Sequence, residues 1–377
     1  MSISEPKNLL TYHDLTVEVE TSPPQELVDH VHTTTLGQPG GFRYQHVDLV
    51  DRLNAPGENY FMFLRKSGKM MGSVGFVGRH TQTGGVDHDS WMIRYFSIKA
   101  PLRAVPKKRK EKPDLKDENK RTTVLGRFIQ PILAQPSQLR GEEDPDRPSI
   151  IYALIEQKNL RSMNFSAQMG LETIGEVASF SFSRLRPKYS KRVECLPDSE
   201  KESMELLLQD FYSGYNLFYS NSLFKDNGYF VIRHSGRVVA GLQEYPITWR
   251  IIDFGSSFAN WIVRFGTKIP WVRRRVDPDE ARMLAFDGIY CEPGYEDVLY
   301  ELMEGVLAEK KRYLAMLMMD RKSGLYKIFS EKGMLGPLHK VLGFFKADVR
   351  MRFINIPDKT RQLFMERPTY IPSYDNS

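Results

Sequence analysis

The chain has 377 residues, and its 53 Lys and Arg against 47 Asp and Glu give a formal net charge of +6. Hydrophobic residues make up 41% and aromatic residues 12% of it, which excludes a wholly disordered protein and predicts two to three domains of roughly 150 residues. Because it has two cysteines, no visible secretory signal and no apolar run near the roughly 20 residues of a membrane helix, we expect a soluble, cytoplasmic protein without a disulfide framework.

The predicted elements come in the same order twice along the chain, which indicates an internal repeat. Each copy holds a hairpin pattern of two apolar segments around a Ser-Gly-basic turn, at 60–72 (YFMFLRKSGKMMG) and at 229–241 (YFVIRHSGRVVAG). Around the first hairpin we expect strands at 15–20, 91–98, 149–155 and 178–184, and helices after Pro24 and up to Gly170. Around the second we expect strands at 192–196, 283–290 and 313–319, and helices after Asp198 and up to Gly333. The pattern predicts a mixed α/β unit used twice, in domains 1–187 and 188–377.

The excess positive charge lies in residues 99–127, where eleven cations and four anions give a local charge of +7. By composition, residues 104–120 are a solvated loop, and nucleic-acid binding or a localisation signal are the alternatives. The chain shows no second basic stripe interleaved with aromatic residues, which single-strand binders have. We therefore expect no nucleic-acid partner.

A helix is expected to begin directly after this loop, in the segment 121–127 (RTTVLGR). The first backbone N–H groups of a helix have no partner within it, so they bind a pyrophosphate without special side chains. Arg121 and Arg127 would add charge-assisted hydrogen bonds, and Gly126 would allow close approach of the backbone. Thr122 or Thr123 is alternatively an ordinary N-cap.

Two motifs of the first copy resemble those of the GNAT superfamily of acyl-CoA-dependent N-acyltransferases. Residues 121–126 match that family's pyrophosphate loop, Gln/Arg-x-x-Gly-x-Gly/Ala, except that Val124 replaces the first glycine. Residues 159–171 are similar to its signature Asn-x-x-Ala-x-x-x-Tyr-x-x-x-Gly-Phe, with Asn159 matching and Ser166 in place of the tyrosine. The resemblance covers about residues 10–185 and, in diverged form, 190–355.

The resemblance implies two tandem domains, each a mixed, mostly antiparallel sheet flanked by helices. It also implies that the first copy binds an acyl-CoA, with acetyl-CoA as the expected co-substrate. The residues that it assigns to CoA are Phe96, Ser97 and Ile98 through their backbone N–H groups, and Arg121, Thr122, Thr123, Val124, Leu125, Gly126, Arg127, Asn159 and Ser162. Two features depart from the family: the insertion 104–120 before the loop, and Pro131, which is expected to kink or end the helix.

Acyl transfer to an amine needs a neutral amine and a polarised thioester carbonyl, and the leaving thiolate can take up a proton. Glu156, just past its strand, is the candidate base, with a solvated loop carboxylate as the alternative. Ser166 stands where the resemblance implies a thiol-protonating tyrosine. Because serine is a poor acid, water or another group protonates the thiolate, or the step is not needed. The histidines do not cluster with further ligands, so we expect no metal.

The second copy differs at the corresponding helix start, 294–300, where Glu296 and Asp297 would repel phosphates. We therefore expect it to be structural, or a wall of the acceptor site. Its insertion, 246–275, carries three tryptophans beside six cations. That composition fits a membrane surface, a lid over the acceptor pocket or an ordinary packed segment.

The sequence thus predicts an N-acyltransferase that moves an acyl group, expected to be acetyl, to an amine of an unidentified acceptor. Two alternatives stay open. One is a CoA-binding module without catalysis, suggested by Val124 and Ser166. The other is transfer of a longer acyl chain at a membrane surface. The oligomeric state is also open.

Overall fold

The computed structural model describes residues 7–53, 57–98, 124–257, 260–261, 265, 273, 277–342 and 346–376. Its first half contains β1 (Lys7–Tyr12), β2 (Leu15–Glu20), α1 (Gln25–His32), β3 (Phe42–His46), α2 (Leu49–Leu53), β4 (Glu58–Lys66), β5 (Lys69–Thr83), β6 (Val86–Ile98), α3 (Val124–Ala134), β7 (Ser149–Glu156), α4 (Leu160–Gln168) and β8 (Glu172–Ser183). Its second half contains β9 (Glu194–Cys195), α5 (Lys201–Phe211), β10 (Tyr229–His234), β11 (Arg237–Phe254), β12 (Ala281–Cys291), α8 (Glu296–Glu309), β13 (Leu314–Asp320), α9 (Gly324–Lys332), α10 (Pro337–Leu342), β14 (Lys346–Ile354), α11 (Asp358–Glu366) and α12 (Ser373–Asn376).

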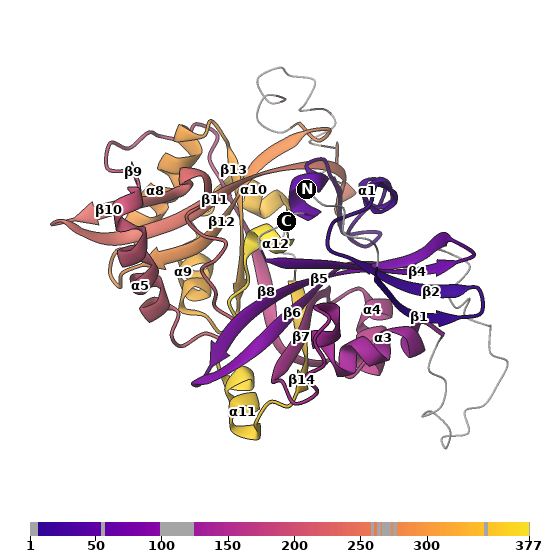
Figure 1. Cartoon of the computed structure of the whole chain (residues 1–377). Helices are drawn as coiled ribbons and strands as arrows, with labels where there is room; N and C mark the ends of the chain where they lie inside the picture. The colour runs from indigo at the N-terminus through magenta and orange to yellow at the C-terminus, as the bar shows by residue number, and fades with distance from the viewer. Residues whose placement is uncertain are drawn as a thin grey trace, which may run out of the picture.

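The repeated order of elements that the sequence predicts is present in the structure (Figure 1). Both hairpins, β4–β5 and β10–β11, turn on a Ser-Gly pair with left-handed backbone angles: φ is 48° at Ser67, 77° at Gly68, 49° at Ser235 and 80° at Gly236. Two successive residues with positive φ form the turn whose twist matches that of the flanking strands, so short-range sequence fixes both hairpins.

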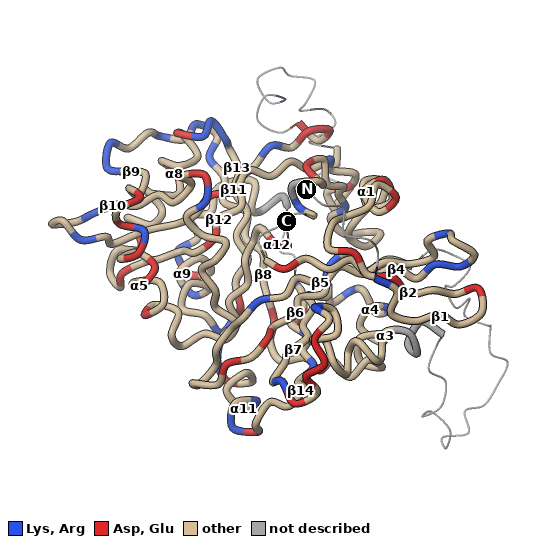
Figure 2. The backbone as a smooth tube through the Cα atoms, in the orientation of Figure 1, with Lys and Arg blue, Asp and Glu red and all other residues tan. Residues whose placement is uncertain are grey.

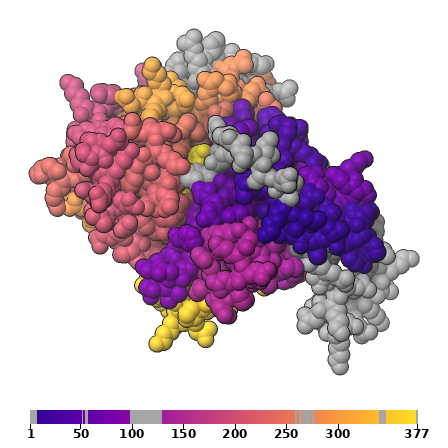
Figure 3. Space-filling view, viewed as in Figure 1, coloured from indigo at the N-terminus to yellow at the C-terminus, as the bar shows by residue number. Residues whose placement is uncertain are grey.

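The described strands form one 14-stranded sheet in which the two halves exchange strands. Its order is β1-β2-β4-β5-β6-β7-β14-β8-β13-β12-β11-β10-β9, with β3 paired to β11. β14 of the second half lies between β7 and β8, and β8 pairs with β13. Backbone hydrogen bonds therefore join the halves, which meet along a long boundary (Figure 3). The proposed domain border at 187 falls directly after β8 and stays a prediction.

Side chains of both faces of β7 are buried, which explains its nearly continuous apolar sequence. Ile151 and Ala153 pack on the side of α3 and α4, and Ile150 and Tyr152 pack against the second half. Lys, Arg, Asp and Glu are interspersed along the described chain (Figure 2), and the formal charge outside residues 99–127 sums to −1.

The structure bears on two points that the sequence leaves open. Pro131 lies inside α3, which continues to Ala134, so the proline does not set the end of the helix. Residues 246–254 extend β11 and pair with β12 as far as Trp249, so this part of the second-half insertion belongs to the sheet. Trp249 is buried there.

Candidate active site

The strands β6 and β7 separate at the centre of the first half. They pair in parallel only from Asp89↔Ser149 to Met92↔Tyr152, although they continue to Ile98 and Glu156. Opposite this point β6 bulges against β5, and Tyr95 has a φ of 50°. A bulge of this kind ends regular pairing and re-aims side chains, and bulges are frequent beside active sites.

A cavity of about 690 Å³ lies at this separation. On one side of the sheet it is lined by apolar residues, among them Ile129 and Leu133 of α3 and Met169 beside α4. On the other side it reaches Trp249, Met283 and Met316 of the second half. The cavity therefore passes between the separated strands and connects the two faces of the sheet.

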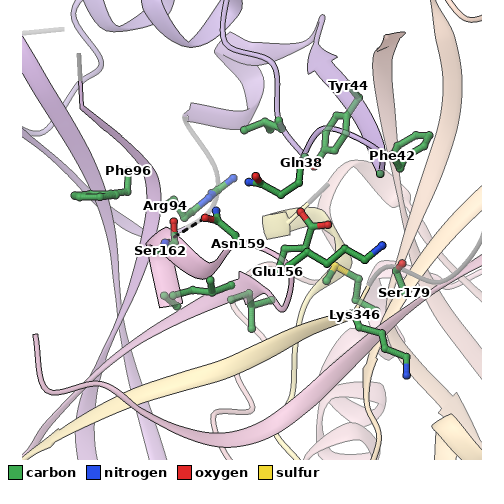
Figure 4. Close-up of a pocket in the computed structure, with 18 of the residues that line it drawn as sticks. Gln38, Phe42, Tyr44, Arg94, Phe96, Glu156, Asn159, Ser162, Ser179 and Lys346 are labelled. Carbon is green, nitrogen blue, oxygen red and sulfur yellow. Dashed lines mark hydrogen bonds between the residues drawn. The ribbon is translucent and has the colours of Figure 1, made fainter. Parts of the chain in front are cut away.

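Glu156 lines this cavity at the end of β7 (Figure 4). Alternate side chains of β7 point to the same face of the sheet, so Glu156 lies on the face of Tyr152 and Leu154, which packs against the second half. The loop before β3 passes over it, because a methyl group placed on Gly41 would lie 3.7 Å from Oε1. Burial raises the pKa of this carboxyl above its usual 4.5, while the charge of Lys158 acts in the opposite direction. A carboxylate with a raised pKa is suited to take a proton near neutral pH.

The same face carries a group of aromatic and basic side chains. Tyr44 stacks on Trp249 with ring centroids 4.0 Å apart, and Phe42 lies 5.9 Å from the same ring. His46 is 5% exposed, and its Nδ1 has no hydrogen-bond partner among the described residues. Burial, followed by the charges of Arg52 and Arg94, lowers the pKa of His46 to about 3, so it is neutral at pH 7.

Several residues that the sequence assigns to the site line this cavity: Phe96, Glu156, Asn159, Ser162 and Ser166. Phe96 stacks on Phe165 with centroids 5.0 Å apart. The Asn159 side chain accepts a hydrogen bond of 3.1 Å from the Ser162 backbone N–H and so caps α4. The Ser166 hydroxyl donates to the Met163 carbonyl at 2.9 Å. Asn159 and Ser166 thus have structural partners of their own.

The other predicted CoA residues lie further along β6 and α3. The Ser97 hydroxyl is 2.7 Å from His30 Nε2 in α1, and Ile98 ends β6. The segment 124–127, which contains Val124, Leu125, Gly126 and Arg127, forms the first turn of α3. Arg121, Thr122 and Thr123 lie outside the described residues, as does the loop 104–120.

The equivalent strand separation in the second half is filled by the chain itself. β12 and β13 pair only at Leu284↔Ala315 and Ala285↔Met316, and Gly288 has a φ of 53° in a matching bulge. The space left there is about 30 Å³. The C-terminal segment occupies the crevice, and its Ser373 and Tyr374 backbone N–H groups donate to the buried Asp287 carboxylate.

Sequence reasoning missed much of the cavity wall. Arg94, His46 and Asp375 line it from β6, β3 and the C-terminal segment, and Trp249 of β11 lines it within the insertion for which a lid was one of the open alternatives. None of them belongs to a motif, and only the tertiary fold brings them together. One local signal could have identified Arg94: it interrupts the apolar strand pattern that begins at Trp91, and arginine is rarely buried without a partner.

In the described part of the chain no three His, Cys, Asp or Glu residues are placed to hold a metal ion. No described helix is long and apolar enough to cross a membrane.

No protein-family model and no curated protein matches this chain. Among solved structures it is similar to Saccharomyces cerevisiae N-myristoyltransferase with bound myristoyl-CoA, with a TM-score of 0.54 and 10% identity over 93% of this chain and 85% of that one. A second structure of that yeast enzyme with myristoyl-CoA matches with a TM-score of 0.55 and 10% identity over 92% and 81%. This similarity confirms the fold class expected from the sequence, a mixed α/β architecture, which here has the fold of the yeast enzyme.

Proposed function

We propose that the chain is an acyl-CoA-dependent N-acyltransferase whose first half binds the acyl-CoA between β6 and β7. The observation that carries this proposal is the cavity that connects both faces of the sheet where these parallel strands separate. A thioester entering from the side of α3 and α4 would meet, on the other face, an acceptor bound against the second half. The two substrates would thus approach each other without sharing an entrance.

Backbone groups supply the polar contacts to the acyl-CoA. β6 has no β7 partner beyond Met92, so the N–H groups near Phe96, Ser97 and Ile98 are the ones proposed for the pantetheine and the thioester carbonyl. Donors fixed in this way stabilise the negative charge that develops on the carbonyl oxygen. The start of α3 would hold the pyrophosphate, with Arg121 and Arg127 adding charge.

Glu156 is the proposed base. The amine attacks the carbonyl carbon, a C–N bond forms, the C–S bond breaks, and the amine proton passes to the Glu156 carboxylate. The hydroxyl of Ser166 donates a hydrogen bond to the Met163 carbonyl, so we assign protonation of the thiolate to water. The hydroxide that this leaves takes up the proton held by Glu156. Holding amine and thioester together supplies a large share of the rate.

Acetyl is the proposed acyl group, and a longer chain is the second candidate. The second candidate is favoured by the apolar wall formed by Ile129, Leu133 and Met169, which extends the cavity beyond the separated strands. A series of acyl-CoA thioesters of increasing chain length distinguishes the two, because kcat/KM peaks at the length that fills this wall.

Release of free CoA thiol in the presence of a library of primary amines tests the proposal. We expect amine-dependent thiol release that follows formation of an N-acyl product. Acyl-CoA that binds without amine-dependent release would instead support a CoA-binding module, and absence of binding would contradict both.

A further inference from the structure

Arg94 and Glu156 are charged residues of the cavity wall that form no ion pair with any described residue. Arg94 is 7% exposed, and its guanidinium lies 4.9 Å from the centre of the Tyr95 ring. Its hydrogen bond within the described chain is the one donated to Tyr95 Oη, at 2.9 Å. An arginine has five N–H donors, and a buried guanidinium without a counter-charge is costly.

The two charges lie on the same face of the sheet. β5 and β6 pair regularly up to Gly75↔Arg94. The Arg94 side chain therefore points to the same face of the sheet as that of Met92, which packs against the second half. Glu156 faces the same way from β7. Figure 4 shows both side chains on the side of the cavity where Gln38 lies.

The other titratable groups of the cavity wall have partners, carry no charge or are exposed. Asp375 pairs with Arg79 and accepts from Tyr219, and Arg52 pairs with Asp48. His46 is neutral at pH 7 because of its lowered pKa. Lys158 and Lys346 also line the cavity, but both are exposed, and Lys346 lies 3.8 Å from Glu176. Arg94 is therefore the buried cation of this wall without a described counter-charge, and it lies with Glu156 beside the rings of Phe42, Tyr44 and Trp249.

We propose that the acceptor is an amino carboxylic acid with an apolar side chain, whose amine meets Glu156 and whose carboxylate pairs with Arg94. The inference rests on the proposed acyltransferase function and names its substrate class. A carboxylate accepts two parallel hydrogen bonds from a guanidinium, which offsets the desolvation of Arg94 in the complex. The apolar side chain would lie against the rings of Phe42, Tyr44 and Trp249.

Three matched acceptors test the proposal: phenylalanine, phenylalaninamide and 2-phenylethylamine, with the corresponding leucine series as a repeat. For the parent protein we expect kcat/KM to be at least about tenfold higher for the amino acid, because the other two leave Arg94 without a counter-charge. In Arg94→Gln, kcat/KM for the amino acid is expected to fall about 30- to 1,000-fold. The preference over the two analogues that lack a carboxylate should then shrink to less than about twofold, and Arg94→Lys should restore part of it.

Arg192→Gln is the matched control, since Arg192 belongs to the second half, does not line the cavity and pairs with Glu301 at the surface. It should keep the parent's preference, and titration with acyl-CoA should show that Arg94→Gln is folded. Equal kcat/KM for the three acceptors in the parent would overturn the proposal. An equal loss for all three in Arg94→Gln would also overturn it and would place Arg94 at the thioester. If the parent binds no acyl-CoA, the proposed function itself fails and this inference falls with it.

Discussion

Replacing Arg79 by methionine is expected to lower the free energy of unfolding by about 3 to 5 kcal/mol. Arg79 of β5 is 6% exposed and forms an ion pair with Asp375, which is 5% exposed. It also donates to Tyr152 Oη at 2.9 Å and lies 4.0 Å from the Tyr219 ring centre. Without the guanidinium, the Asp375 carboxylate stays buried with the Tyr219 hydroxyl at 2.8 Å as its remaining partner. The loss would reach the C-terminal segment that fills the second crevice.

Urea unfolding followed by circular dichroism measures this effect. Arg192→Met is the control, because its pair with Glu301 is exposed and such pairs contribute about 0 to 1 kcal/mol. Replacing both partners, as Arg79→Met with Asp375→Asn, should recover part of the loss since no buried charge then lacks a partner. Equal losses for Arg79→Met and Arg192→Met would show that the buried pair is not important for stability.

Local patterns predicted the repeated elements, whereas pairing between distant strands was not predictable. The turns at Ser67-Gly68 and Ser235-Gly236 are encoded by adjacent residues, so both hairpins could be placed from sequence. The position of β14 between β7 and β8 depends on pairs such as Val349↔Leu154, which are far apart in the chain. A fully buried strand shows no alternation that would identify its neighbours.

The same distinction holds for the candidate site. The segment around Glu156 and Asn159 follows a predicted strand, and both residues line the cavity. Arg94, His46 and Trp249 come from three strands whose meeting depends on how the halves pack, so no spacing in the sequence links them. The N-cap role of Asn159 could have been expected, because asparagine is a preferred capping residue.

Replacing Glu156 by glutamine is expected to lower kcat about 10²- to 10⁴-fold, the contribution typical of a general base. In the parent, kcat/KM should rise with pH as the carboxyl loses its proton. Because burial raises the pKa of Glu156, this rise should lie above pH 4.5, where an ordinary glutamate titrates. The variant has no group to titrate at this position, so its profile should lack that limb.

Measurement of kcat and of the pH profile with the best acceptor checks this expectation. Glu143→Gln, at an exposed position, is the matched control and should behave as the parent does. Titration with acyl-CoA should give similar affinities for all three proteins. A Glu156→Gln variant with the kcat and the pH profile of the parent would rule out Glu156 as the base.

Isothermal titration with acetyl-CoA tests most directly whether the first half binds an acyl-CoA between β6 and β7. We expect one site in the parent with a Kd between about 1 µM and 1 mM, the range of ordinary enzyme substrates. Ala153→Trp fills the cavity from β7, so its affinity should be at least tenfold lower, whereas Ala167→Trp, at an exposed position of α4, should bind as the parent does. Arg121→Glu should also bind more weakly, by reversing a charge at the proposed pyrophosphate loop. Absence of binding in the parent, or equal binding by Ala153→Trp, would show that no acyl-CoA binds between β6 and β7.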